Sequence, residues 1–231
     1  MIEATYIDHM GSDLSVVNAA RVSFGQKSDW EWSDEEGATN YTCGQEDGKI
    51  YLKLSDRDTK LIKYLAKHKH ISPFGHAFAS FHVKAPVFVA RQLVKHKFLR
   101  WNEISRRYVD DEPEFYVPDV WRGRSEDKKQ GSDGEVSVPY LVPHEFNRSA
   151  LYEYETLLEA GVAPEQARMV LPMSMMTEWY WSGSLDAFAS MCHLRCKPDT
   201  QYESRIVAEA IDDEMMKLFP VAWEALRAYE E

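Results

Sequence analysis

Two segments of the sequence alternate between apolar and other side chains, and they constrain the fold more than any other feature. In residues 77–85, Ala79, Phe81 and Val83 fall on one face of an extended chain. In residues 173–181 the same spacing places on one side Met173, Met175, Thr177, Trp179 and Trp181. Alternation with a period of two residues is typical of a β-strand that has one face in the core. The sequence therefore predicts that both segments are strands of a core sheet.

Apolar residues at helical spacing predict helices between and after these strands. The first helix begins at Ser55, whose hydroxyl suits the N-cap, and its apolar stripe consists of Leu61, Ile62 and Leu65. A second helix has Pro86 in its first turn, and its predicted buried side consists of Val87, Phe88, Ala90 and Val94. Further helices are predicted for residues 143–160, 163–172, 184–195 and 200–218.

Two polar stretches are predicted as surface loops. Residues 26–50 are polar and broken by glycine, and residues 123–137 are charged with almost no apolar content. Both are expected to lie on the surface of a single domain that spans residues 1–231. Before them, residues 1–25 contain short mixed segments that end in a turn at Gly25.

A basic segment, residues 91–107, stands out because the whole chain carries a net charge of −11. It holds six Lys or Arg residues and one acidic residue, Glu103. A positive cluster in a negative molecule attracts small anions. Asn102, Ser105 and Arg107 add hydrogen-bond donors that suit a phosphorylated ligand. We expect this segment to form an anion site from the end of a helix and the loop that follows.

Composition narrows the class of protein. The charge of −11 argues against bulk nucleic-acid binding, and no apolar run is long enough to cross a bilayer. The N-terminus shows no secretory signal pattern. Three cysteines, Cys43, Cys192 and Cys196, suit a reducing compartment, so a cytoplasmic protein is expected. The spacing of Cys192 and Cys196 also allows zinc, but buried thiols are favoured because no second ligand pair follows.

Several polar residues have two interpretations. His68, His70 and His76 allow a metal site, although hydrogen-bonding histidines that line a pocket are favoured by their irregular spacing. Arg195, at a predicted helix end, is either a cation that satisfies the last carbonyls or a donor aimed at a ligand. Arg168 likewise either donates to a ligand or pairs with a nearby acidic residue. No motif for a serine nucleophile surrounds Ser105, which is interpreted as a phosphate donor.

Several blocks, in the same order, resemble the flavin-dependent thymidylate synthase family. They are residues 20–24 (ARVSF), 70–76 (HISPFGH), 81–92 (FHVKAPVFVARQ), 102–108 (NEISRRY), 167–172 (ARMVLP), and Leu194-Arg195 followed by Gln201-Tyr202-Glu203. The family hallmark is Arg-His-Arg with a serine after seven further residues. Here it reads Lys95-His96-Lys97 with Ser105 at the matching distance. The charge is kept, but lysine lacks the planar fork of arginine, which predicts weaker retention of the flavin.

The resemblance implies an α+β fold, with an antiparallel-type sheet flanked by helices, and a reductive methylation of dUMP to dTMP. Methylenetetrahydrofolate is expected to supply the carbon, and FAD reduced by NADPH the hydride. The family forms homotetramers in which several subunits build each active site. The expected partners are therefore dUMP, folate, NADPH and further copies of the chain, with no nucleic acid and no membrane.

The resemblance also assigns residues. Arg195 is the expected catalytic residue, at the uracil edge, where a cation favours ionisation of the ring. Substrate binding is expected from Gln92, Lys95, Glu103, Ile104, Ser105, Arg106, Arg107, Arg168 and Arg195. Flavin binding is expected from His70, Ser72, Lys95, His96, Lys97, Glu103, Ser184 and Ser190. Asp186 stands where a relative has arginine.

Two rival functions remain open from the residues themselves. A metal-dependent nucleotide phosphohydrolase would use the His68–His76 group. A single-strand nucleic-acid-binding module would use Arg100, Trp101, Arg106, Arg107 and Tyr108, with aromatic stacking and phosphate contacts.

Overall fold

A computed structural model describes residues 1–33, 41–45, 48–108, 111–126, 131–138 and 143–229. Its centre is a four-stranded antiparallel sheet in the order β1-β5-β9-β6. The strands are β1 (Glu3–Met10), β5 (Phe78–Pro86), β9 (Met176–Ser184) and β6 (Leu99–Glu103). The two alternating segments of the sequence are thus the central pair, β5 and β9, as predicted, although β9 begins three residues later than residue 173.

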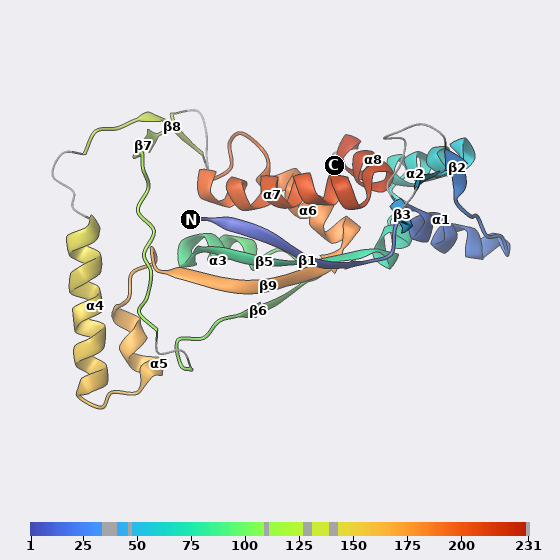
Figure 1. The fold of residues 1–231 in the computed structure, drawn as a ribbon. Coiled ribbons are helices and arrows are strands. Elements are labelled where there is room, and N and C mark those ends of the chain that lie inside the picture. The colour runs from blue at the N-terminus through green and yellow to red at the C-terminus, as the bar shows by residue number, and fades with distance from the viewer. Residues whose placement is uncertain (34–40, 46–47, 109–110, 127–130, 139–142, 230–231) are drawn as a thin grey trace.

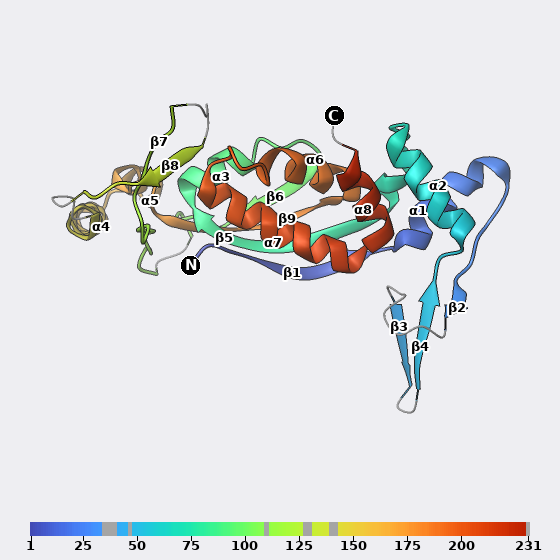
Figure 2. The ribbon, with the colours of Figure 1, turned by 90° about the horizontal axis from the view of Figure 1, so that it is seen from above.

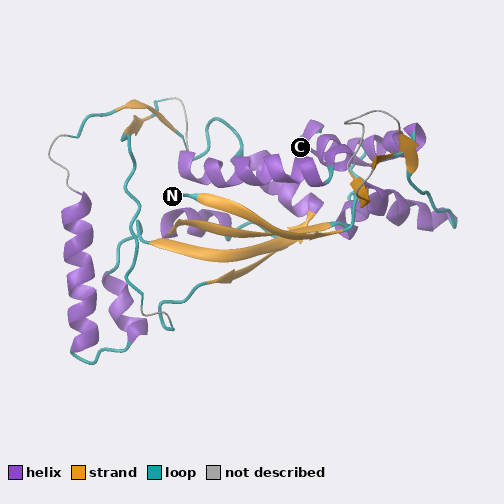
Figure 3. Ribbon diagram, viewed as in Figure 1, coloured by secondary structure: helices purple, strands orange, loops and turns teal. Residues whose placement is uncertain are grey.

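Helices cover one face of this sheet (Figures 1 and 3). They are α3 (Val87–Leu93), α6 (Leu185–Arg195) and α7 (Tyr202–Leu218), with α8 (Pro220–Ala228) packed beside α6 and α7. The α+β prediction is confirmed. The opposite face carries polar pairs, for example Ser80 with Ser182 at 2.8 Å and His82 with Glu178 at 3.0 Å. An antiparallel sheet with one polar face produces the alternation seen in the sequence.

The buried face of the sheet is aromatic. Trp181 lies opposite Phe81 in the β5–β9 register, and both rings contact Phe188 of α6 edge-on. Trp101 of β6 stacks on Trp179, with ring centroids 4.3 Å apart and an interplanar angle of 18°. These large rings fix β6 and α6 on the sheet, and therefore position the ends of both elements.

The remaining elements lie at the two ends of the sheet (Figure 1). At one end are α1 (Asp13–Arg21), the 3₁₀ turns Val22–Phe24 and Ser72–His76, and α2 (Asp56–Lys67), which Ser55 caps as predicted by accepting the Asp58 amide at 3.1 Å. At the other end are α4 (Pro143–Glu159), α5 (Pro164–Ala167) and the turn Arg168–Val170. None of the helices in the described ranges has the length and apolarity that a membrane span requires.

Both predicted surface loops contain strands. In residues 26–50, β2 (Glu31–Ser33), β3 (Tyr41–Gln45) and the first part of β4 (Gly48–Lys53) belong to a separate sheet in the order β2-β4-β3, which extends from the body in Figure 2. In residues 123–137, β8 (Ser132–Glu135) pairs with β7 (Arg122–Arg124). The loop prediction was wrong at these strands because backbone pairing, not an apolar face, defines a hairpin.

Two predictions about the basic segment also need correction. The helix after Pro86 ends at Leu93, so Val94 is its C-cap and is 48% exposed, while Val89, Ala90 and Leu93 are buried. Beyond it, the predicted loop contains β6. Charged residues in β6 hid this strand, because an edge strand with an open face tolerates charge.

Three elements outside these loops, β1, α1 and α8, were not predicted. The mixed N-terminal segments are β1 and α1, and the turn at Gly25 is confirmed by its positive φ of 62°. Helix α8 begins at Pro220, and only Phe219 separates it from α7. The two thiols with described side chains are free, and Cys192 is buried as predicted, whereas Cys196 is half-buried.

Candidate functional site

Arg195 is held by a side chain of α3 and by one from the turn that follows α3. It is the last residue of α6, and it donates through Nε to His96 Nε2 at 3.0 Å and through Nη1 to Gln92 Oε1 at 3.5 Å. Gln92 in turn donates to Gln201 Oε1 and accepts from Ser204 Oγ at 3.2 Å. The recorded partners of Arg195 are thus side chains rather than the last carbonyls of α6.

Burial changes the acid–base behaviour of this cluster. Burial, and then the nearby charge of Arg195, lower the pKa of His96 from 6.5 to about 4. His96 is therefore neutral near pH 7, and its Nε2 can accept a hydrogen bond from the Arg195 Nε–H group. Burial also lowers the pKa of Arg195, but arginine stays protonated. The guanidinium keeps its full charge between two neutral acceptors.

A cavity of about 630 Å³ lies beside this cluster. Four of the residues predicted to hold the flavin line it, namely Lys95, His96, Lys97 and Ser190. Lys69 and Lys197 add positive charge, and Asp186 adds a carboxylate. Asp186 Oδ1 is buried and has no hydrogen-bond partner. A cavity of this size and polarity suits a large anionic ligand that also offers hydrogen-bond donors.

The same cavity contains unusual backbone. Lys69 and Phe98 both line it, with φ of 55° and 64°, and they are the non-glycine residues with positive φ in the part of the chain that the structure describes. Such conformations are costly for residues with a Cβ, and they concentrate at ligand sites. Phe98 is 84% exposed, so packing of its side chain does not explain its backbone conformation.

The loop after β6 forms a second group. Glu103 accepts from Thr177 Oγ1 at 2.7 Å and from the Trp101 indole at 3.1 Å. Ser105 Oγ accepts from the backbone and side chain of Arg107, each at 3.4 Å, and Arg106 pairs with Asp111. In Figure 1 the chain continues from β6 away from α3 and α6. The half-buried Ser105 and the exposed Arg107 thus place a hydroxyl and a guanidinium in the same turn.

The predicted site residues therefore fall into separate places within one chain. Gln92, His96 and Arg195 meet, and Lys95, Lys97 and Ser190 line the adjoining cavity. Across the described ranges, no hydrogen bond or ion pair joins Arg195 to residues 103–107, which include Ile104. Arg168 is exposed at the end of α5, where it donates to the Glu165 carbonyl at 3.3 Å.

The other predicted flavin ligands do not line the cavity. Ser184 is the buried N-cap residue of α6, while His70 and Ser72 are exposed next to the cavity residues Lys69 and Ile71. His68 and His70 contact the Tyr64 ring. Within the described ranges, no group of three potential metal ligands forms, so the histidines do not converge.

Sequence reasoning assigned no role to Gln201 and Ser204, which orient Gln92. Both lie at the start of α7, and Gln201 was part of a block quoted for the resemblance. Their position at the start of a helix with a buried face was the available signal for this role. Polar residues are common at helix starts, however, so the signal was not specific.

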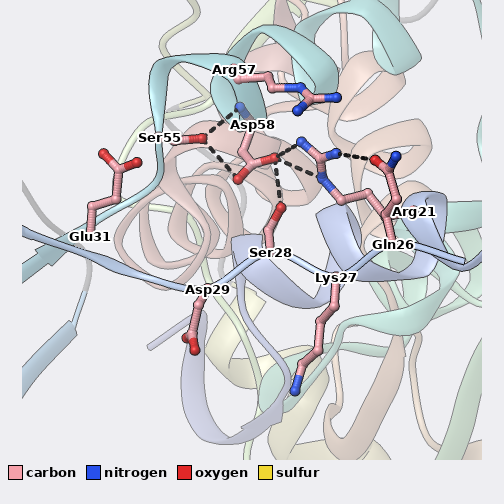
Figure 4. Close-up of a pocket in the computed structure, with 9 residues that line it drawn as sticks. All are labelled: Arg21, Gln26, Lys27, Ser28, Asp29, Glu31, Ser55, Arg57 and Asp58. Atoms are coloured by element: carbon pink, nitrogen blue, oxygen red, sulfur yellow. Dashed lines mark hydrogen bonds and ion pairs between the residues drawn. The ribbon is translucent and has the colours of Figure 1, made fainter.

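A second hollow, of about 460 Å³, lies between α1 and the start of α2 (Figure 4). Its central feature is Arg21, which donates to Asp58 and, at 3.2 Å, to Gln26. Burial raises the pKa of Asp58, but hydrogen bonds from Arg21, Ser55 and Ser28 outweigh it, so the pKa is lowered. Arg21 is thus neutralised within the protein, and the ARVSF block has a structural role here.

Comparisons with known proteins extend over nearly the whole chain. The family model described as thymidylate synthase complementing protein matches residues 5–221. A flavin-dependent thymidylate synthase of Thermus thermophilus is 36% identical over 225 residues, 96% of this chain and 74% of the relative. One of Thermotoga neapolitana is 36% identical over 224 residues, 96% of this chain and 89% of the relative.

A solved structure has the same fold. It is a UMP/dUMP methylase, PolB, from Streptomyces cacaoi, bound with 5-Br dUMP. The TM-score is 0.79 at 32% identity, over 99% of this chain and 96% of that chain.

Proposed function

The chain belongs to the flavin-dependent thymidylate synthase family, and we propose that it converts dUMP to dTMP by reductive methylation. The carbon donor is methylenetetrahydrofolate, and NADPH is the reductant. The comparisons support neither the metal-dependent phosphohydrolase nor the single-strand nucleic-acid binder. The observation that carries the proposal is Arg195, held between neutral partners beside a basic cavity.

Arg195 acts on the uracil ring in this proposal. Its guanidinium faces the edge of the base and stabilises the negative charge that develops when N3 ionises and C5 becomes nucleophilic. Gln92 and neutral His96 hold the guanidinium without neutralising it, so its charge remains available to the ring. Gln92, near the end of α3, and Lys95, in the turn that follows, add contacts to the nucleotide.

The cavity fits FAD, which supplies the hydride when bound. Lys95 and Lys97 would neutralise its phosphates, His96 and Ser190 would donate or accept hydrogen bonds, and the unpartnered Asp186 oxygen would accept from a hydroxyl or amine. His70 and Ser72 would contact it from the rim. Ser184 would contribute through its place at the N-terminus of α6, and Glu103 from a neighbouring subunit.

The phosphate of dUMP binds at the loop after β6 in this proposal. Ser105 and Arg107 donate to it, Arg106 and Ile104 present backbone groups, and Glu103 accepts from the nucleotide. Since this loop and Arg195 are separate within one chain, the complete site takes the loop and Arg168 from other copies. We therefore propose a cytoplasmic homotetramer.

The test is the visible spectrum followed by an assay. The purified protein is expected to be yellow, to bleach with NADPH and to regain colour on aeration. With methylenetetrahydrofolate and dUMP it should form dTMP, measured by chromatography; UMP is assayed in parallel because the structural relative is a UMP/dUMP methylase. A colourless preparation that takes up no added FAD would contradict the proposal.

A further inference from the structure

A buried carboxylate lies close to the candidate site but outside it. Glu203, the second residue of α7, is 4% exposed. It pairs with Arg122 and accepts from the Tyr116 hydroxyl at 3.4 Å. Burial, and then Glu203, raise the pKa of Tyr116 to about 12, so Tyr116 remains a hydrogen donor. A buried charge is stable only with such partners.

Arg122 reaches α7 from the β7–β8 hairpin. Its Nε donates to Ser132 Oγ of β8 at 2.9 Å, and its guanidinium lies 4.5 Å from the centre of the Tyr202 ring. Figures 1 and 2 both show the hairpin beyond the N-terminal end of α7. The β7–β8 hairpin therefore holds the start of this helix through an ion pair and a cation–π contact.

The same helical turn also faces the candidate site. Gln201 and Ser204, on either side of Glu203, both bond to the Gln92 amide. Because the Gln92 nitrogen donates to Gln201 and its oxygen accepts from Ser204, the oxygen is directed toward Arg195. One turn of α7 thus connects the hairpin to the guanidinium.

We propose that Glu203 and Arg122 are positioning residues for Arg195, acting through the first turn of α7 and Gln92. This inference rests on the proposed function, in which Arg195 meets the uracil ring. The ion pair fixes the turn, the turn fixes the Gln92 amide, and the amide holds one side of the guanidinium. Tyr116 also packs against Phe88 of α3, with 6.1 Å between the ring centres. Through its contacts with Phe88 and Glu203, it fixes the position of α3 relative to α7.

Glu203→Gln keeps the size of the side chain but removes its charge. We expect roughly tenfold weaker dUMP binding and slower turnover, with FAD affinity unchanged, since one charged hydrogen bond is lost. Tyr116→Phe should act in the same direction more weakly, and it tests the idea if Glu203→Gln does not fold. Glu209→Gln, which removes an exposed partner of Arg205 on the same helix, should have no effect.

A double-mutant cycle separates positioning from general stability. In a Gln92→Ala background, Glu203→Gln should have little further effect on dUMP affinity, because the hydrogen bond from Arg195 to Gln92 is already absent. Additive losses, or unchanged dUMP affinity in both Glu203→Gln and Tyr116→Phe, would overturn the inference. Failure of the unaltered protein to bind dUMP would instead count against the proposed function.

Discussion

Arg195 donates to two neutral acceptors, His96 and Gln92, and forms no ion pair with any residue that the structure describes. A carboxylate in either place would offset the charge on which the proposed role at the uracil ring depends. The site therefore orients a cation while leaving it free to act on a ligand. The sequence could place Arg195 at the end of a helix, but only the fold shows which side chains surround it.

Replacing Arg195 tests this arrangement. Arg195→Ala should reduce dTMP formation by at least about a hundredfold, the usual scale for loss of one electrostatic contact in a transition state. Flavin absorbance of the purified variant should persist, because Lys95 and Lys97 remain. Arg195→Lys keeps the charge without the planar donors and should retain part of the activity. Unaltered turnover in Arg195→Ala would show that the assignment is wrong.

The lowered pKa of His96 predicts that the free energy of unfolding depends on pH. In the unfolded chain this histidine takes up a proton near pH 6.5, whereas in the folded protein it does so only near pH 4. Its contribution to the free energy of unfolding is therefore present above pH 6.5 and is lost as the pH falls toward 4. Urea unfolding at pH 7.5 and 5.0 should show a larger loss for the unaltered protein than for His96→Gln. His68→Gln, at an exposed histidine, is the control and should behave as the unaltered protein.

Strand β6 depends on one glycine of its neighbour. A Cβ at Gly183 would collide with the Leu99 side chain and lie 3.1 Å from the Phe98 carbonyl. The absence of a side chain lets β6 approach β9 where the cavity residue Phe98 precedes the strand. This contact links the core of the sheet to the candidate site.

Gly183→Ala should therefore lower the free energy of unfolding by about 1–3 kcal/mol, the cost of overpacking, and weaken FAD binding as well. Gly75→Ala is the matched control, because its Cβ would meet nothing within 4 Å, and it should be nearly neutral in stability. Chemical denaturation and flavin titration measure the two effects. Equal stability of the two variants would contradict this account of the β6 contact.

Elements with an apolar period were predictable, and elements without one were not. The segments of β5, β9, α2, α6 and α7 all carry a buried face whose spacing is visible in the sequence. In contrast, β6 (LRWNE) is a short strand at the sheet edge with only two apolar residues, and β3 with β4 forms a hairpin by backbone pairing. Val94 was misassigned because a one-residue difference in the helix end moves a side chain out of the core.

At the scale of the whole molecule, the candidate site is divided. Arg195 and the cavity lie on the helical side of the sheet, whereas the chain carries residues 104–108 away from it (Figure 1). Sequence reasoning placed these residues in one site through the resemblance, and it could not reveal which of them share a chain. That depends on assembly, which a linear pattern does not encode.

Mixing two inactive variants tests the shared site. Arg195→Ala and Arg107→Ala proteins, each inactive alone, should regain partial activity when they are unfolded and refolded together. Some sites then receive an intact guanidinium from one copy and an intact loop from another. Each variant unfolded and refolded alone is the control. No activity in the mixed sample would mean that each site is built from one chain.

Asp13 places a constraint on how this protein is made. Its carboxylate is fully buried and accepts the backbone amides of Val221 and Ala222 at 3.1 and 2.9 Å. A ribosome synthesises these partners more than two hundred residues after Asp13. Until they emerge, the carboxylate lacks these two donors, so its burial is less favourable and α1 remains more hydrated. Completion of the core is thus a late event in translation, and a nascent chain stalled before residue 220 should remain open to proteases at its first helix.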